Sequence, residues 1–437
     1  MFFYYCRLAW LSIRRNPVLS TLMMAAIALG IGAAMTTLTI NYLMSANPIP
    51  GKSEQLFYVQ LDSWDPNQPY AEPNEPPDQL TYRDATNLKE AGQAKLQAAM
   101  TQSAAVIEPK ELGKKPFMAY LRLTHNDFFE LFEPPFLYGQ GWSDEADKSG
   151  RLTIVLSKKN NDELFDGANS VGETITMMDR EFEVVGVLDE WQLKPRFYDV
   201  TTGAFNSMEH GYVPFKLRET LEMPNSGNTN CWKSPDGEGF QAFLQSECIN
   251  YQFWVQLDDA DAEQDYMSFL NAYVEQQKQL GRFPRPLNNR LSDVMEWMEN
   301  QQVVDDDAQV MFYLALMFLL VCLLNTVGLL LTKFVSKSGE IALRRAVGAS
   351  RADLYWQHLV ESALIGVGGG AGGLILAWLG LQGIKSLYGD NLAGLAELDL
   401  TLVAIGIVLA IVSSLLAGAY PTWRACRIPP ASQLKTQ

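Results

Sequence analysis

Histidine is nearly absent from this sequence, with three copies among 437 residues, and none lies near other metal-binding residues at a typical ligand spacing. No G-x-x-x-x-G-K-[ST] sequence occurs, which excludes ATP hydrolysis by the phosphate-loop route. No Ser–His–Asp or Cys–His arrangement for nucleophilic catalysis stands out either. We therefore expect this chain to hold no metal and no cofactor, and to have no enzymatic activity.

Charge is also missing from four long stretches of the chain. These stretches are Asn16–Gly51, Val310–Thr332, Ser362–Ile384 and Leu400–Trp423. A helix needs roughly 20 residues to cross a bilayer core about 30 Å thick, so each stretch is long enough. The sequence predicts four transmembrane helices, the first within 1–50 and the others over 310–332, 359–384 and 400–423.

The first apolar stretch has an alternative interpretation as a cleaved signal peptide, because Met44-Ser45-Ala46 resembles a processing site. The apolar part of a signal peptide is usually only about 7–15 residues long. This stretch is much longer, which favours a retained membrane anchor.

The placement of Lys and Arg predicts the orientation. Outside the long loop 46–308 the chain has twelve basic residues, and eleven of them lie on one side of the predicted membrane, with Lys385 as the exception. Cytoplasmic segments carry the excess of basic residues. Both termini are then cytoplasmic, and the loop 46–308 is extracytoplasmic.

The loop 46–308 is strongly acidic, with 44 Asp and Glu against 22 Lys and Arg, whereas the whole chain has a formal net charge of -16. Such a surface is unsuited to nucleic acid and is repelled by anionic lipid headgroups. Strand-like and helix-like segments alternate along 51–285, which predicts an α+β domain. Residues 286–309 contain few helix breakers, so we expect a helical stalk that continues into the second span.

Two of the five cysteines, Cys231 and Cys248, lie in the loop that faces the oxidising compartment. They flank a region rich in Gly, Pro and Asn, and they are candidates for a disulfide. A bridge there would contribute roughly 3 kcal/mol by closing the loop. The alternative is a pair of buried free thiols.

A run of glycines lies inside the third predicted span. A phosphate-binding loop is one interpretation, but the run lacks the Lys-Ser/Thr ending of such a loop. Small residues in membrane helices let neighbouring helices approach closely. We therefore expect helix packing at Gly366, Gly368, Gly369, Gly370, Gly372 and Gly373.

Residues 337–354, between the second and third spans, combine apolar and charged side chains at helical spacing and present a cationic face. One interpretation is a plain cytoplasmic loop whose basic residues only set the topology. The segment contains E-I-A-L-R-R-A-V-G-A-S-R-A-D-L and follows an apolar helix that carries L-N-T. That combination resembles the signature of the MacB/FtsX-like ABC permease family.

Three other parts of the chain resemble the same family. Residues 8–33 are similar to its first helix, residues 153–189 to its extracytoplasmic module, and the tail Y-P-T-W-R-A-C-R-I-P-P-A-S-Q-L to its C-terminal end. The resemblance implies that 337–354 is a coupling helix that docks on a separate ATPase subunit. The expected contact residues are Glu340, Ile341, Arg344, Arg345, Val347 and Gly348.

The resemblance also implies a domain layout, a location and a set of partners. The layout is a first span within 1–50, a periplasmic MacB-like core over 51–285, the stalk over 286–309 and an FtsX-like permease domain over 310–437. The chain is expected in a bacterial inner membrane as a homo- or heterodimer, in contact with lipid and not with nucleic acid. Its other expected partners are an ATPase that binds the ATP, a periplasmic adaptor and an outer-membrane exit duct.

The function implied by the resemblance is export of a peptide, toxin or drug by mechanotransmission, in which ATP-driven motion is passed through the membrane to the periplasm. Extraction of lipoproteins is a related alternative. FtsX-like control of an extracellular hydrolase is a second, and a membrane-tethered sensor without an ATPase is a third. The length of loop 46–308 favours the MacB-like form, and the amphipathic cationic segment argues against the sensor.

Overall fold

Apolar helices and a mixed β-sheet occupy different parts of this chain. The structure is a computed structural model that describes residues 2–110, 114–303, 306–388 and 400–427. The chain divides into two compact units. We call Met1–Ser45 together with Val304–Gln437 the membrane unit, and Ala46–Val303 the inserted domain.

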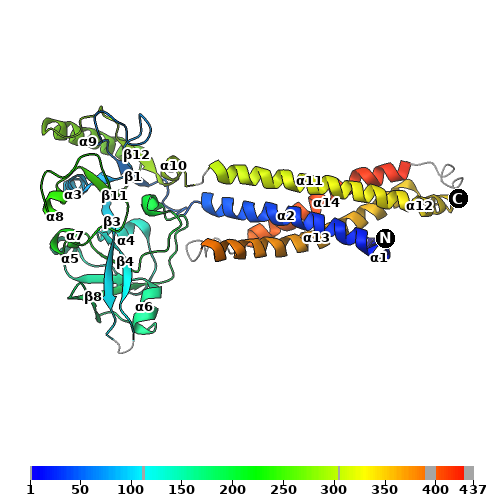
Figure 1. Cartoon of the computed structure of the whole chain (residues 1–437), viewed down its shortest axis with the longest axis horizontal. Helices are drawn as coiled ribbons and strands as arrows, with labels where there is room; N and C mark the ends of the chain where they lie inside the picture. Colours follow the sequence, from blue (N-terminus) through cyan, green and yellow to red (C-terminus); the bar gives the residue numbers. More distant parts are fainter. Residues whose placement is uncertain (1, 111–113, 304–305, 389–399, 428–437) are drawn as a thin grey trace. The chain divides into compact units, whose positions relative to one another are not determined.

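The regular secondary structure of the membrane unit is entirely helical in its described part. Its helices are α1 (Phe2–Arg15), α2 (Pro17–Ser45), α11 (Asp306–Ser336), α12 (Ser338–Ala346), α13 (Arg351–Tyr388) and α14 (Leu400–Arg427). Four of them are long and apolar enough to cross a membrane, over Pro17–Ser45, Gln309–Ser336, Arg351–Ser386 and Leu402–Arg424. The prediction of four transmembrane helices is confirmed. In Figure 1, α2, α11, α13 and α14 lie side by side, and each is in contact with at least two of the others.

The glycines of the third span lie inside α13, on its contacts with two different helices. A Cβ added at Gly370 would lie 2.4 Å from the Cβ of Ala410 on α14, and one at Gly366 would lie 2.1 Å from the side chain of Ser414. Gly368, Gly369, Gly372 and Gly373 approach α2 in the same way, at Met24, Ile27, Ala28 and Ile31. The glycines therefore allow close packing of α13 against α2 and α14, since helices lacking a Cβ at the contact can come nearer.

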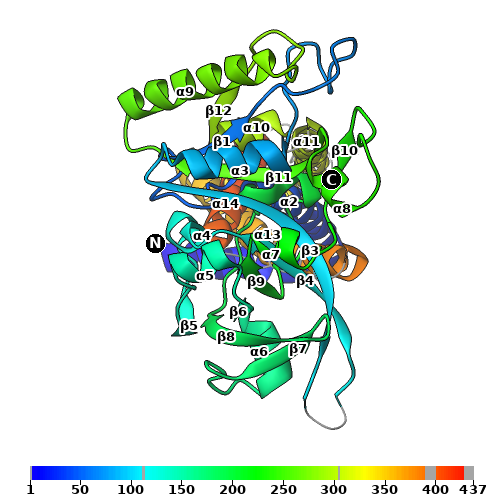
Figure 2. The ribbon, with the colours of Figure 1, turned by 90° about the vertical axis from the view of Figure 1, so that its left-hand side faces the viewer.

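The inserted domain is built on a twelve-stranded mixed sheet in its described part. Its strands are β1 (Leu56–Gln60), β2 (Leu80–Thr81), β3 (Leu96–Glu108), β4 (Phe117–Thr124), β5 (Phe136–Gly139), β6 (Thr153–Leu156), β7 (Thr174–Met177), β8 (Arg180–Leu188), β9 (Gly211–Pro214), β10 (Asn230–Cys231), β11 (Cys248–Gln256) and β12 (Arg290–Asp293). The main order is β12-β1-β11-β3-β4-β9-β6-β8-β5, and β4·β9 and β6·β8 are its parallel pairs. Figure 2 shows β3 and β4 running along the length of the sheet.

Helices accompany the strands, as an α+β domain requires. They are α3 (Tyr82–Ala91), α4 (Asp127–Phe132), α5 (Asp144–Ser149), α6 (Lys158–Phe165), the 3-10 helix η1 (Phe197–Thr202), α7 (Leu217–Thr220), α8 (Phe240–Leu244), α9 (Ala260–Gln279) and α10 (Val294–Asn300). The predicted fold class, a helical membrane protein with a large α+β domain between its first and second spans, is confirmed.

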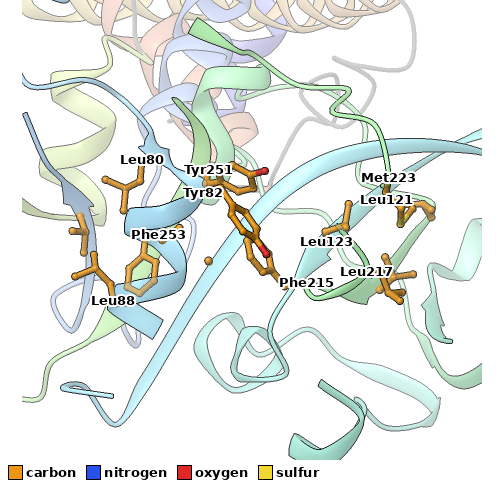
Figure 3. Close-up of a cluster of buried hydrophobic side chains, with 14 of the residues drawn as sticks. Leu80, Tyr82, Leu88, Leu121, Leu123, Phe215, Leu217, Met223, Tyr251 and Phe253 are labelled. Atoms are coloured by element: carbon orange, nitrogen blue, oxygen red, sulfur yellow. The ribbon is translucent and has the colours of Figure 1, made fainter. Parts of the chain in front are cut away.

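Side chains from the two faces of the sheet form two separate cores, because alternate residues of a strand point to opposite faces. On β1, Phe57 and Val59 join a core with α3 and α9, whereas Leu56 and Tyr58 join one with α4, η1 and α10. Figure 3 shows part of the first core. There the ring of Tyr82 on α3 stacks on that of Phe215, with centroids 5.8 Å apart. Both faces are therefore covered, which explains why β1 is buried along its whole length.

The predicted continuous helical stalk over 286–309 is wrong, because strand and turn interrupt it. Residues 290–293 form strand β12, which pairs with β1, and only Val294–Asn300 are helical before a turn over 301–303. Residues 304–305 lie outside the described part, and α11 begins at Asp306. Helix propensity along the segment was overridden by backbone pairing with β1, a long-range contact that residue spacing does not reveal.

A fully buried group of charges joins η1 to the sheet. Arg122 on β4 pairs with Asp199 at 2.6 Å and also with Glu209, and Arg196 pairs with Glu209 at 3.2 Å. Burial alone would raise the pKa of Asp199, but the two guanidinium groups outweigh it and lower that pKa to about 2. They lower the pKa of Glu209 as well. All four groups therefore stay charged and paired at neutral pH, and they fix the irregular segment around η1.

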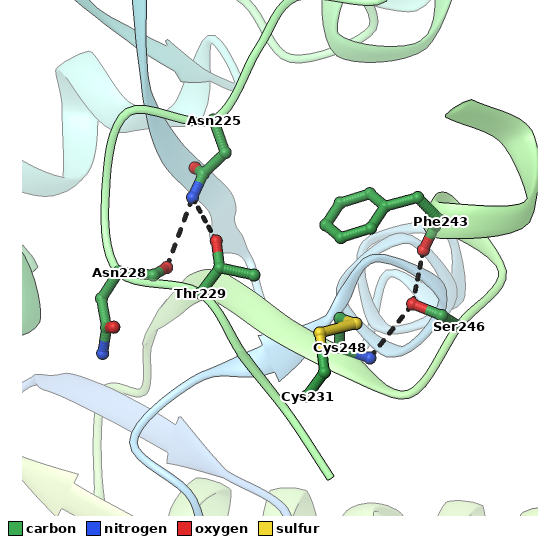
Figure 4. Close-up of a disulfide and its surroundings, with 7 residues drawn as sticks. All are labelled: Asn225, Asn228, Thr229, Cys231, Phe243, Ser246 and Cys248. Atoms are coloured by element: carbon green, nitrogen blue, oxygen red, sulfur yellow. Dashed lines mark hydrogen bonds between the residues drawn. A yellow bond between two sulfur atoms is a disulfide. The ribbon is translucent and has the colours of Figure 1, made fainter. Parts of the chain in front are cut away.

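The structure links Cys231 and Cys248 in a disulfide that spans 17 positions. The two residues are register partners on β10 and β11. Figure 4 shows the local hydrogen bonds, from Asn225 to Thr229 and from the backbone nitrogen of Cys248 to the hydroxyl of Ser246 at 3.2 Å. The bridge therefore closes the irregular excursion that precedes β11.

Changing both bridge residues to serine should lower the free energy of unfolding of the inserted domain by about 3 kcal/mol, because the unfolded chain regains the entropy of the open loop. Thermal unfolding with and without reductant measures this. Reductant should destabilise the unchanged chain and leave the double variant unaffected. Cys6→Ser, at a free cysteine outside the domain, is the control and should change nothing. Insensitivity of the unchanged chain to reductant, with free thiols at both positions by mass spectrometry, would contradict the prediction.

Candidate functional site

The segment between the second and third spans forms a short helix and a tight turn, not the single helix predicted over 337–354. α12 ends at Ala346, and Gly348 has a φ of +106°, a conformation that favours glycine. α13 then begins with a reciprocal cap, in which the Ser350 hydroxyl accepts from the nitrogen of Asp353 at 3.1 Å and the Asp353 carboxylate accepts from the nitrogen of Ser350 at 3.3 Å. The glycine turn therefore separates α12 from α13.

One predicted contact residue of α12 points into this chain. Ile341 is only 7% exposed and packs in a core with Phe334 and Leu354. Its role in docking is therefore corrected to one in holding α12 in place. Leu343 is 60% exposed and Val347 is 83% exposed, so the apolar surface that α12 presents outward is made by these two residues. Leu343 was missed because helical spacing alone does not say which apolar stripe faces inward.

Charged residues border the exposed apolar surface. Arg344 donates to Glu340 at 2.7 Å and to Gln357 of α13 at 3.0 Å. Arg345 is half-buried, and Gly348 is exposed at the turn. We call Glu340, Leu343, Arg344 and Val347 the α12 surface. An apolar centre with a polar rim is the usual anatomy of a protein-binding surface.

A buried polar cluster near α12 is centred on Glu361 of α13, which is 1% exposed. Its carboxylate pairs with Lys333 of α11 at 2.6 Å, and it lies 3.3 Å from the Nδ1 of His358 and 3.9 Å from the Nζ of Lys337. The hydroxyl of Ser12 on α1 donates to the same carboxylate and accepts from Lys337. We call these residues the Glu361 cluster.

The cluster joins several helices at a single carboxylate. Lys333 also donates to Ser20 of α2 at 3.4 Å, so α1, α2, α11 and α13 all contribute a side chain. Lys337 precedes α12 directly, which connects the start of α12 to the same point. A cavity of about 90 Å³ lies beside the cluster, lined by α1, α12 and α13. Ionisable residues inside membrane helices are costly to bury and commonly have a functional role.

The sequence carried a weak signal for this cluster. Lys333 and Glu361 stand at the ends of apolar stretches, where they read as the charges that terminate a span. Both lie within the helical spans of the structure. Their 28-residue separation gives no periodic relation, so only the folded arrangement of α11 and α13 reveals the pair.

Comparisons with known proteins agree with this layout. Residues 20–268 match the family model described as MacB-like periplasmic core domain, and residues 312–430 match the one described as FtsX-like permease C-terminal. The last residues of the second match and of the tail motif, from 428 onward, lie outside the described part of the structure.

Three relatives illustrate the likeness. The pyoverdine export ATP-binding/permease protein PvdT of Pseudomonas syringae pv. syringae is 22% identical over 99% of this chain and 59% of its own length. The macrolide export ATP-binding/permease protein MacB of Syntrophobacter fumaroxidans is 23% identical over 71% of this chain and 46% of its own length. The ABC transporter permease YknZ of Bacillus subtilis is 20% identical over 98% of both chains. The chain thus spans about half the length of the first two relatives.

Two solved structures are similar to part of this chain. The periplasmic region of MacB from Actinobacillus actinomycetemcomitans aligns with a TM-score of 0.37 and 15% identity, covering 59% of this chain and 96% of that one. The extracellular domain of YknZ aligns with a TM-score of 0.34 and 15% identity, covering 55% of this chain and 100% of that one.

Proposed function

Because the chain belongs to the MacB/FtsX-like family of ABC transporter permeases, we propose that it transmits ATP-driven motion from a cytoplasmic ATPase to its inserted domain. The ATPase is a separate polypeptide, which binds the ATP, so the chain itself needs no cofactor and catalyses no reaction. The observation that carries the proposal is the α12 surface, an exposed apolar and charged face on a helix whose preceding residue, Lys337, belongs to the Glu361 cluster.

Movement of α12 reaches the spans through covalent and polar links. α12 follows α11 after Ser336 and precedes α13 by a short turn, and Lys337 ties its start to Ser12 and Glu361. A partner that displaces the α12 surface therefore acts on α1, α11 and α13 together. Such a rigid connection suits a machine that switches between discrete packings.

The orientation supports an ATPase on the α12 side. Eleven of the twelve basic residues outside loop 46–308 lie on that side, which favours a cytoplasmic position for α12 and both termini. The inserted domain is then periplasmic in a bacterial inner membrane. We further propose a dimer of permeases that engages a periplasmic adaptor and an outer-membrane exit duct.

Export of a peptide, toxin or drug is the favoured activity, because two relatives bear the names of export proteins and the inserted domain is large. Extraction of lipoproteins and control of an extracellular hydrolase are the alternatives. Isolation of the chain with its partners from native membranes distinguishes these functions. A co-purifying adaptor supports export, and a co-purifying hydrolase supports signalling.

The proposal predicts that the double change Leu343→Ser and Val347→Ser weakens ATPase binding at least about tenfold, because apolar residues at the centre of an interface carry most of its binding energy. The ATPase is the one that co-purifies with the unchanged chain. Arg344→Gln with Arg345→Gln should also impair transport. If these arginines only set the membrane topology, the same double change should leave transport unaffected. Leu280→Ser, at a leucine of the inserted domain whose 70% exposure lies between those of Leu343 and Val347, is the matched control.

Orientation is checked in the same variants by labelling single cysteines with an impermeant reagent. Asp65→Cys should be labelled from outside and Lys337→Cys should not. Normal ATPase binding and transport by both double variants, with unchanged orientation, would show that the α12 surface is not the docking site. The absence of any co-purifying ATPase would contradict the proposed function itself.

A further inference from the structure

The first fifteen residues form a helix of their own. α1 ends at Arg15, and α2 begins at Pro17 after a bend at Asn16. Proline lacks a backbone N–H and fixes its φ, so it starts a helix readily and interrupts the one before it. α1 is therefore free to run in a different direction from the span that follows.

One side of α1 is fixed to the membrane unit. The hydroxyl of Tyr5 donates to Asp353 of α13 at 3.3 Å, and Ala9 is buried. One turn further along, Ser12 belongs to the Glu361 cluster. These three residues recur at helical spacing, so the opposite side of α1 faces outward over its whole length.

The outward side of α1 alternates aromatic residues with arginines. It consists of Tyr4, Arg7, Trp10 and Arg14, all exposed and spaced three or four apart along one face, and we call it the α1 stripe. The guanidinium of Arg14 lies 5.2 Å above the ring of Trp10. No Asp or Glu occurs among residues 1–45, so nothing acidic within α1 or α2 neutralises the stripe.

We propose that the α1 stripe lies in the headgroup layer of the membrane and binds anionic phospholipid. Tyrosine and tryptophan rings favour the boundary between acyl chains and headgroups, and arginine binds phosphate through several donors. A helix with apolar and basic residues mixed along its exposed face is suited to this layer. Two features favour lipid over a protein partner: the stripe has cations without acids, and it leads within two residues into a transmembrane helix.

The consequence is a second anchor for the Glu361 cluster. Ser12 holds the carboxylate from one side of α1 while the stripe holds lipid from the other. Anionic lipid therefore stabilises the position of α1 against α13. This proposal does not depend on an ATPase or on the direction of transport.

The test uses the full chain in lipid nanodiscs, with a fluorophore attached to Phe3→Cys, at a residue that is 89% exposed, after replacement of the other unpaired cysteines. The discs contain phosphatidylcholine alone or an equal mixture with phosphatidylglycerol, and nitroxide lipids quench the probe near the headgroup or deep in the acyl chains. We expect stronger headgroup-level than deep quenching, and an increase of about twofold with phosphatidylglycerol. Arg7→Gln with Arg14→Gln should abolish the increase, and Lys385→Gln, far from α1 in sequence, should keep it.

Any one of the following results would overturn the proposal. A probe that stays in water shows that the stripe does not meet the membrane, and deep quenching as strong as or stronger than headgroup-level quenching shows that the stripe is not in the headgroup layer. If the probe is shielded from water only after a co-purified ATPase is added, or only in dimers of the chain, the stripe binds a protein. If phosphatidylglycerol increases the quenching equally in the Arg7→Gln/Arg14→Gln variant and in the Lys385→Gln control, these arginines do not recognise the anionic lipid.

Discussion

Replacement of Glu361 by alanine should destabilise the membrane unit by about 3–5 kcal/mol, because it leaves the buried ammonium group of Lys333 without its partner. Lys333 and Glu361 are each 1% exposed, and their charged atoms are 2.6 Å apart. Ser12, Lys337 and His358 lose the same acceptor. To measure the effect, the purified chain is heated in detergent, and its unfolding is monitored as the loss of the monodisperse peak in size-exclusion chromatography.

Glu340→Ala is the matched control. It removes a carboxylate from an ion pair of similar length, 2.7 Å to Arg344, but this pair lies on the surface with 36% and 43% of its side chains exposed. Exposed pairs typically contribute well under about 1 kcal/mol. The double change Lys333→Met with Glu361→Met should recover much of the lost stability, since it removes both buried charges. Equal, small effects of Glu361→Ala and Glu340→Ala would show that the Glu361 cluster does not hold the helices together.

The change of Gly366 and Gly370 to alanine should destabilise the unit by about 1–3 kcal/mol for each residue, because the added methyl groups have no room against α14. At Gly370 the obstacle is the Cβ of Ala410, which cannot rotate away, at 2.4 Å. The helices must then separate along the contact. The same heating assay measures the loss.

Gly383→Ala tests whether the loss comes from packing. Gly383 lies on the same helix, and a Cβ there meets nothing within 4 Å. Alanine favours helix over glycine by up to about 1 kcal/mol, so this change should be neutral or slightly stabilising. If the double variant behaved like Gly383→Ala, α13 and α14 would not pack as closely as the structure shows.

The sequence determined the parts of this protein that depend on local composition. Charge-free stretches of membrane length gave the four spans, and the acidic, alternating segment between the first two gave the α+β domain. Both follow from whether each stretch of the chain prefers lipid or water, which can be judged without knowing its tertiary contacts. The packing glycines were readable for the same reason, since small residues inside an apolar helix have few other uses.

The tertiary structure decided which side chains face which neighbours. Within α12 it buried Ile341 and exposed Leu343, two apolar residues that helical spacing places on different faces without showing which face is inward. It also made 290–293 a strand, because these residues pair with β1. That partner lies more than 200 residues earlier in the sequence, so the local pattern did not reveal it.

The buried charges show the same limit. Glu361 meets Lys333 and Ser12, and Arg122 meets Asp199 and Glu209, from helices and strands far apart in the chain. A charged residue in a sequence reads as solvent-exposed, because burial without a partner is too costly. Only the folded arrangement supplies the partner, and with it the reason that these charges can be buried.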